Sequence, residues 1–251
     1  MSNTLKTVLL TVLVGLIFTG LMIGLRISQT PAGTAAASSL SSLFALNSVQ
    51  AWWYVTRAAG LTSYFLMWLS MVWGLAVASR IFQPVIEGSH SYDFHEFLSL
   101  LGIGFVVLHV SVLMLDKYLP FSIWQVLIPF VSTYRPIWVG IGIIGFYILL
   151  LVTVTFYARR AIGVGVFRAI HTLSLLGYLG TTLHGLLAGT DSALVMTRLL
   201  YAGTFLVVVF LTVHWLVLVL AAKMDRTRAE RRRLAKRPHG RRSASKQQNP
   251  I

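Results

Sequence analysis

Six long stretches without a charged side chain divide this sequence. They are residues 7–25, 58–79, 97–115, 136–158, 169–190 and 199–222, of 19 to 24 residues each. A helix needs roughly 20 residues to cross about 30 Å of hydrocarbon. Lipid offers the backbone no hydrogen-bond partners, so each stretch should be helical. The mean hydropathy of +0.76 and the charged fraction of 11% argue against a soluble domain. We therefore predict an all-α fold, an integral membrane bundle of six transmembrane helices in the lipid bilayer.

Three features near these stretches bear on the span count. The apolar core of residues 7–25 is longer than that of a typical signal peptide and predicts an uncleaved helix. Residues 27–50 are rich in small residues and predict a loop. Residues 118–134 contain Pro120 and Pro129 and predict a segment that lies on the membrane surface or re-enters it.

The distribution of Lys and Arg predicts the orientation, because cytoplasmic loops carry an excess of them. With both termini in the cytoplasm, sixteen of the 21 basic residues fall on the cytoplasmic side. Ten of these lie in Met224–Ile251, which carries +8 of the net charge of +14. We predict a multi-pass protein of the cell inner or plasma membrane with this orientation.

The chain divides into three parts by the same criteria. Residues 1–50 hold the first span and the outer loop, residues 51–223 form the main membrane domain, and residues 224–251 form a basic, disordered cytoplasmic tail. The tail should lie against anionic lipid, with docking of an acidic flavoprotein as the alternative. It lacks interleaved aromatic residues, so we expect no nucleic acid partner.

The chain has no cysteine. Disulfides, thiolate metal sites and thiol catalysis are therefore excluded. A metal would have to be held by histidine or oxygen ligands, and redox chemistry would have to come from a cofactor.

Four histidines stand at matched positions on two of the predicted helices. His95 and His109 are 14 residues apart on the third, and His171 and His184 are 13 apart on the fifth. These two helices run parallel, since one span separates them. His109 and His184 each precede an aspartate by seven residues, whereas His95 and His171 lie near the opposite edge. The two levels are roughly 20 Å apart, which predicts two facing pairs stacked across the membrane.

A facing imidazole pair suits a flat macrocycle with iron ligated from both sides, as in a b-type haem. Zinc would want three or four ligands at one level. A spacing of 13 residues falls about 140° short of a full number of turns. Either the fifth helix is irregular, which Gly177 and Gly180 would permit, or its two ligands lie on different flanks. The structural alternative is that these are core histidines bonded to neighbouring helices.

At these residues the sequence resembles the ferric reductase-like transmembrane family. This family includes the membrane halves of NADPH oxidases and ferric reductases and the haem subunit of a bacterial periplasmic methionine sulfoxide reductase. The matching pieces are Phe94-His95, His109, His171 and Leu183-His184-Gly185, and the resemblance covers roughly residues 50–220. It implies two b-type haems, the inner one on His95 and His171 and the outer one on His109 and His184, that carry electrons towards the outer face.

The resemblance stops at the sixth helix. Oxidases and ferric reductases carry a flavin and NADPH module there, whereas 28 residues follow here. We therefore expect no flavin on this chain, a separate donor such as a flavin reductase or quinol, and an outer-face acceptor. The predicted function is that of an electron-transfer component of an oxidoreductase. A haem-bearing anchor or assembly subunit is the alternative; a transporter fits less well, because the six stretches contain no charged residue.

Three further residues could support the cofactors. Arg57 and Arg168 could bind the anionic haem propionates, or could simply reach the headgroups. His214, alone on the sixth helix, is expected to be structural, with a propionate or a quinone as the alternative partner.

Overall fold

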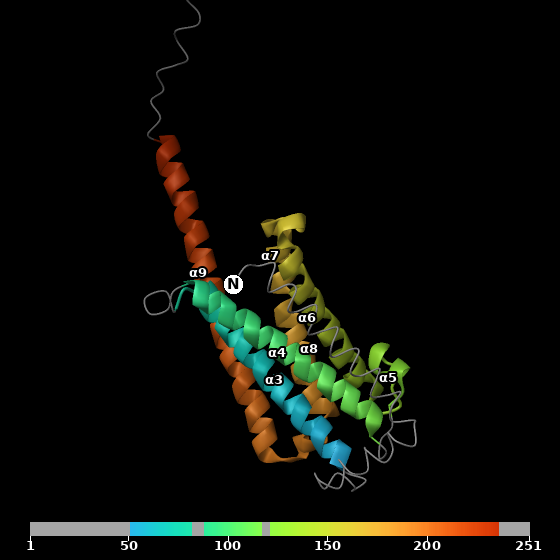
Figure 1. The fold of residues 1–251 in the computed structure, drawn as a ribbon. Coiled ribbons are helices and arrows are strands. Elements are labelled where there is room, and N and C mark those ends of the chain that lie inside the picture. The colour runs from blue at the N-terminus through green and yellow to red at the C-terminus, as the bar shows by residue number, and fades with distance from the viewer. Residues whose placement is uncertain (1–50, 82–87, 117–120, 236–251) are drawn as a thin grey trace, which may run out of the picture.

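The structure is a computed structural model that describes residues 51–81, 88–116 and 121–235. Regular structure in this part of the chain is entirely helical (Figure 1). The helices are α3 (Ala51–Ala78), α4 (Gly88–Leu115), α5 (Ile123–Leu127), α6 (Pro136–Ile162), α7 (Val164–Thr172), α8 (Ser174–Ala188), the 3-10 helix η1 (Thr190–Ala193) and α9 (Val195–Ala235). The all-α prediction is confirmed for these residues.

Four of the described helices are long and apolar enough to cross a membrane. They are Trp52–Ala78, His90–Leu115, Pro136–Ile162 and Val195–Arg232. They match the second, third, fourth and sixth predicted spans, whereas the first span and the loop at 27–50 lie outside the described residues. Leu206 and Phe210 on α9 are 64% and 70% exposed. Such a surface suits contact with lipid and is unusual in a soluble protein.

The fifth predicted span is broken into α7 and α8 at Leu173. The Leu173 N–H bonds to the carbonyl of Ile170, three residues back, at 2.9 Å, as in a 3-10 turn. The fifth helix is therefore irregular, as one of the two sequence alternatives required. The irregularity lies two residues after His171 and not at Gly177 or Gly180.

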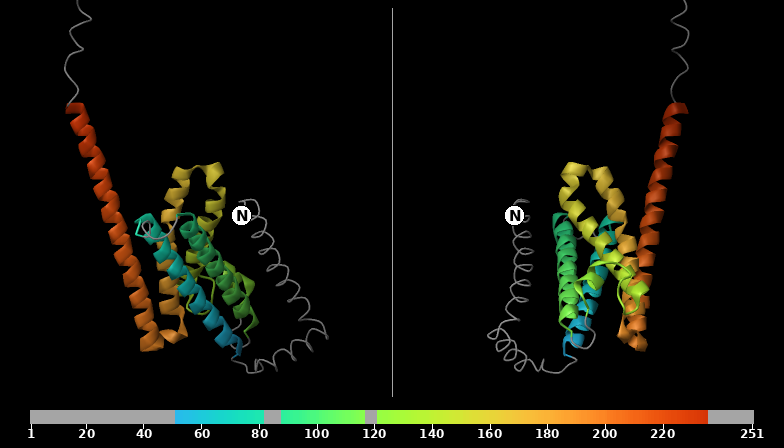
Figure 2. Two further views of the ribbon diagram at one scale, coloured as in Figure 1. Left: turned by 60° about the vertical axis from the view of Figure 1, so that its left-hand side comes forward. Right: turned by 90° about the vertical axis from the view of Figure 1, so that its right-hand side faces the viewer.

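Those two glycines bring α8 close to α6 instead. A Cβ on Gly177 would lie 2.8 Å from Cγ of Leu149, and one on Gly180 would lie 3.3 Å from the carbonyl oxygen of Ile141. Small residues at helix contacts let backbones approach closely, which is the main source of helix association in lipid. The two views of Figure 2 show the remaining arrangement: α3 lies along α4, and α9 passes beside α3.

The segment at 121–135 closes one end of the bundle. Its short helix α5 begins with a capping box formed by Ser122 and Gln125. The Tyr134 hydroxyl donates to the Ala188 carbonyl at 3.0 Å, and Arg135 Nη1 donates to the Leu187 carbonyl at 2.6 Å. These bonds satisfy carbonyls that the end of α8 leaves without helical partners. Residues 121–135 are thus packed against the end of α8.

The sixth predicted helix is longer than expected. The sequence predicted a disordered tail from Met224, whereas α9 continues without a break to Ala235. This part of α9 projects beyond the ends of the other helices (Figures 1 and 2). Residues 224–235 are thus helical where the sequence predicted a disordered tail, because a charge-rich sequence of good helix formers can extend the helix that precedes it.

The close contact of α6 with α8 can be tested by adding one methyl group. We expect Gly177→Ala to lower the stability by about 1–3 kcal/mol, since its Cβ would overlap Leu149. Gly104→Ala in α4 is the matched control, because its Cβ would meet open space and the change should be neutral or gain up to about 1 kcal/mol. Thermal unfolding in detergent measures both; equal melting temperatures would contradict the packing.

Candidate functional site: two cavities lined by histidine pairs

Two cavities lie in line between the helices, and each contains two of the four histidines. His109 of α4 and His184 of α8 line one, which we call the His109 cavity. His95 of α4 and His171 of α7 line the other, which we call the His95 cavity. Counting the space open at their mouths, they measure about 1400 and 930 Å³. The structure thus brings together the pairs that the sequence predicted.

A single layer of side chains separates the two cavities. Met67, Val106 and Phe146 line both of them. They come from α3, α4 and α6, the helices that also surround the histidines. The two cavities are therefore adjacent, and these apolar side chains lie between them.

The ring centres of His95 and His171 are 6.1 Å apart, with the planes at 77° to one another. Two imidazole nitrogens bound to opposite sides of one metal ion, at about 2 Å each, lie about 4 Å apart. Each ring centre lies about 1 Å farther from the metal than its nitrogen does, so the two ring centres lie about 6 Å apart. This spacing fits one metal ion between the rings.

The His109 ring is held to α3 by a reciprocal pair of contacts. Its Nδ1 lies 2.7 Å from the Thr56 carbonyl oxygen. A carbonyl can only accept, so Nδ1 carries the proton and Nε2 is left as a base. In return the Thr56 hydroxyl donates to the His109 carbonyl at 2.8 Å. Such a second contact on the far nitrogen fixes the tautomer and orientation of a metal-binding histidine.

The rings of His184 and His95 also contact neighbouring helices through Nδ1. His184 Nδ1 donates to the Trp138 carbonyl of α6 at 3.0 Å. His95 Nδ1 lies 3.2 Å from the Ser70 hydroxyl of α3, which itself contacts the Ser99 hydroxyl at 2.7 Å. In three of the four histidines, Nδ1 is therefore occupied by a protein partner.

A glycine stands behind each of these three rings. A Cβ on Gly60 would lie 2.9 Å from Nδ1 of His109, one on Gly74 2.9 Å from Cε1 of His95, and one on Gly142 2.5 Å from Cγ of His184. Each glycine follows, by four residues, the residue that contacts Nδ1. The missing side chain lets the ring lie against the neighbouring helix, where it reaches a partner one turn earlier.

His171 departs from this arrangement. Its Nδ1 is buried and has no hydrogen-bond partner within the described part of the chain. The ring is flanked instead by Phe167, one turn earlier on α7, at 5.2 Å between ring centres. For the glycines of the described residues, no atom of His171 is among the three nearest neighbours of the Cβ position.

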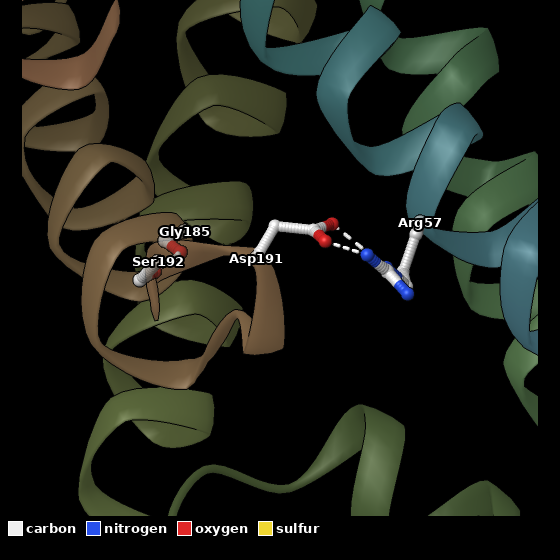
Figure 3. A network of polar contacts seen from close by, with 4 residues as sticks. All are labelled: Arg57, Gly185, Asp191 and Ser192. Carbon is white, nitrogen blue, oxygen red and sulfur yellow. Dashed lines mark hydrogen bonds and ion pairs between the residues drawn. The ribbon is translucent and has the colours of Figure 1, made fainter. Parts of the chain in front are cut away.

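Of the three predicted supporting residues, one lies at a cavity and two do not. Arg57 lines the His109 cavity, but its guanidinium forms an ion pair with Asp191, with Nε 2.7 Å from Oδ2 (Figure 3). Asp191 lies in η1, and the adjacent Ser192 hydroxyl donates to the Gly185 carbonyl at 3.3 Å. Arg168 is exposed on α7 and does not line the His95 cavity, and His214 lines neither cavity.

Sequence reasoning missed the residues that hold the rings. They are the three glycines, Gly60, Gly74 and Gly142, and the partners Thr56, Ser70 and Trp138. One signal was available: Gly60 and Gly74 are 14 residues apart, as are His95 and His109. In an antiparallel helix pair, equal spacing places both glycines opposite both histidines.

The described residues contain no group of three or more His, Asp or Glu side chains that could hold a metal ion. Each cavity thus offers two imidazoles, and the Asp191 carboxylate at the His109 cavity is already paired with Arg57; two imidazoles suit a metal whose other ligands come from a cofactor. No family model, curated protein or solved structure matches this chain.

The ion pair at the His109 cavity should couple α3 to the α8–α9 connection. Arg57 and Asp191 side chains are 31% and 17% exposed. We expect a double-mutant cycle with Arg57→Ala and Asp191→Ala to give a coupling free energy of about 1 kcal/mol. Thermal unfolding of the four proteins measures it; strictly additive effects would show that the pair contributes nothing.

Proposed function

We propose that this chain binds two b-type haems, each between two histidines, and carries electrons across the membrane. It would serve as the membrane component of an oxidoreductase, receiving electrons from a separate flavin reductase or quinol. His95 and His171 would hold the haem near the cytoplasmic face, and His109 and His184 the one near the outer face. This assignment follows the orientation predicted from the basic residues and the resemblance to ferric reductase-like membrane domains.

The observation that carries the proposal is the pairing of histidines from separate helices in two stacked cavities. In the His95 cavity the rings stand 6.1 Å apart, the spacing expected for one metal ion between them. In the His109 cavity both Nδ1 atoms donate to backbone carbonyls, which leaves both Nε2 atoms as donors to a metal. Structural histidines of a helix bundle would need no such common arrangement.

The protein residues would position and insulate the cofactors. Haem iron supplies one-electron chemistry when it is bound. The Thr56 and Trp138 carbonyls strengthen the imidazoles as donors, which favours the oxidised metal. The apolar partition of Met67, Val106 and Phe146 keeps water from the space between the two sites.

Absorption spectroscopy of the purified protein tests the proposal. We expect two haems per chain and a reduced, low-spin, six-coordinate spectrum. His184→Ala should leave one haem, because His109 alone would then face the second site. The control His214→Ala should keep two, since His214 lines neither cavity. A colourless protein, made with ample haem supply, would refute the function.

The glycine behind His184 gives a second, subtler test. Gly142→Ala should displace the His184 ring, because the new Cβ would lie 2.5 Å from Cγ. We expect loss or weakened retention of one haem without loss of the other. Gly104→Ala, whose Cβ meets nothing within 4 Å, is the control. Haem content after gel filtration measures both, and unchanged content in Gly142→Ala would show that the ring can move without consequence.

A further inference from the structure

We propose that His171 is an exchangeable ligand: it is bound in the reduced protein as well, but it leaves the iron of its pair transiently, and a small diatomic molecule can then bind in its place. The inference rests on the proposed function, since it presupposes a haem between His95 and His171. It adds a gas-binding site to a chain otherwise expected only to pass electrons, and it assigns that site to one of the two haems.

The first argument is the missing anchor on the His171 ring. Nδ1 of each other histidine has a partner, at 2.7 Å on His109, 3.0 Å on His184 and 3.2 Å on His95. Nδ1 of His171 is buried without one among the described residues. A second contact on the far nitrogen orients a ligating imidazole and raises its basicity. His171 lacks both benefits, so its bond to iron is the weakest of the four.

The second argument is the element that carries His171. The helix α7 has nine residues and none of them is buried, whereas α8, which carries His184, has four buried residues. The chain breaks from α-helical bonding at Leu173, directly after this turn. Of the long helices, α7 packs mainly against α6, and a short helix that contains no buried residue and ends at a break can shift locally more easily than a long helix of the bundle.

The opposite ligand stays in place. His95 lies on the 28-residue helix α4 and is held through Ser70 and Ser99 to α3. Gly74 lets its ring lie against α3, so that a shift of His95 would need the two long helices to separate. Exchange at this iron therefore takes place on the His171 side.

Once the iron is reduced, the exchange needs no further oxidant or reductant. The bond between iron and the His171 nitrogen breaks, and that nitrogen keeps its electron pair. One bond forms from the lone pair of the incoming molecule to the same iron, whose oxidation state does not change. Carbon monoxide, which binds only reduced haem iron with an open position, is a suitable probe.

The test is the reaction of the dithionite-reduced, full-length protein with carbon monoxide in detergent. We expect half of the haem to shift its Soret band and the other half to stay unchanged. The rate should reach a plateau as the carbon monoxide concentration rises, since departure of His171 limits it. In His171→Ala the plateau should disappear and the rate should rise linearly with concentration.

Two double variants identify the haem that reacts. The variant His109→Ala/His184→Ala should retain the reactive haem, and His95→Ala/His171→Ala should retain only the unreactive one. No shift in the reduced wild-type protein, or a shift in the haem that survives without His95 and His171, would overturn the inference. These results differ from failure of the proposed function, which would appear as absence of haem before any gas is added.

Discussion

The histidine pairs depend on one constraint: an imidazole in the interior of a helix bundle has two nitrogens, and only one of them can face the cavity that the ring lines. The other nitrogen is stabilised by a partner within the protein, because lipid offers none, and three of the four histidines have such a partner. The chain meets this need with a gap on the neighbouring helix, where a glycine lets the ring come close enough to reach a partner one turn back. This occurs at Gly60, Gly74 and Gly142. The packing of the helices and the orientation of these three rings therefore depend on the same contacts.

This constraint also sets the register of the helices. Sliding α3 along α4 by one residue would put side chains in place of Gly60 and Gly74, against His109 and His95. The register is thus defined twice, at two levels 14 residues apart. On the other side, Gly142 fixes α6 against α8 in the same manner, supported by the close approach at Gly177.

Much of this could be predicted from the sequence, because charge is so costly in lipid. Four of the six uncharged stretches coincide with described helices that are long enough to span a membrane, and the distances from His109 and His184 to the next aspartate predicted that these two lie at one level. The ring anchors could not be predicted, since glycine is common in membrane helices and its role depends on the residue opposite. The break at Leu173 also left no signal, because neither glycine nor proline occupies it. The ion pair of Arg57 could not be predicted either, because its partner Asp191 lies 134 residues away in the sequence.

The length of the projecting end of α9 determines how far its charged side chains lie from a membrane surface. From Lys223 to Arg232 an unbroken helix advances about 14 Å, while salt screens a charge over about 8 Å under physiological conditions. An anionic headgroup layer level with Lys223 would therefore attract the first turn of this extension and scarcely act on Arg231 and Arg232. The helix would hold the guanidinium groups of Arg231 and Arg232 away from the headgroups. They would therefore attract anionic groups that approach from the aqueous phase.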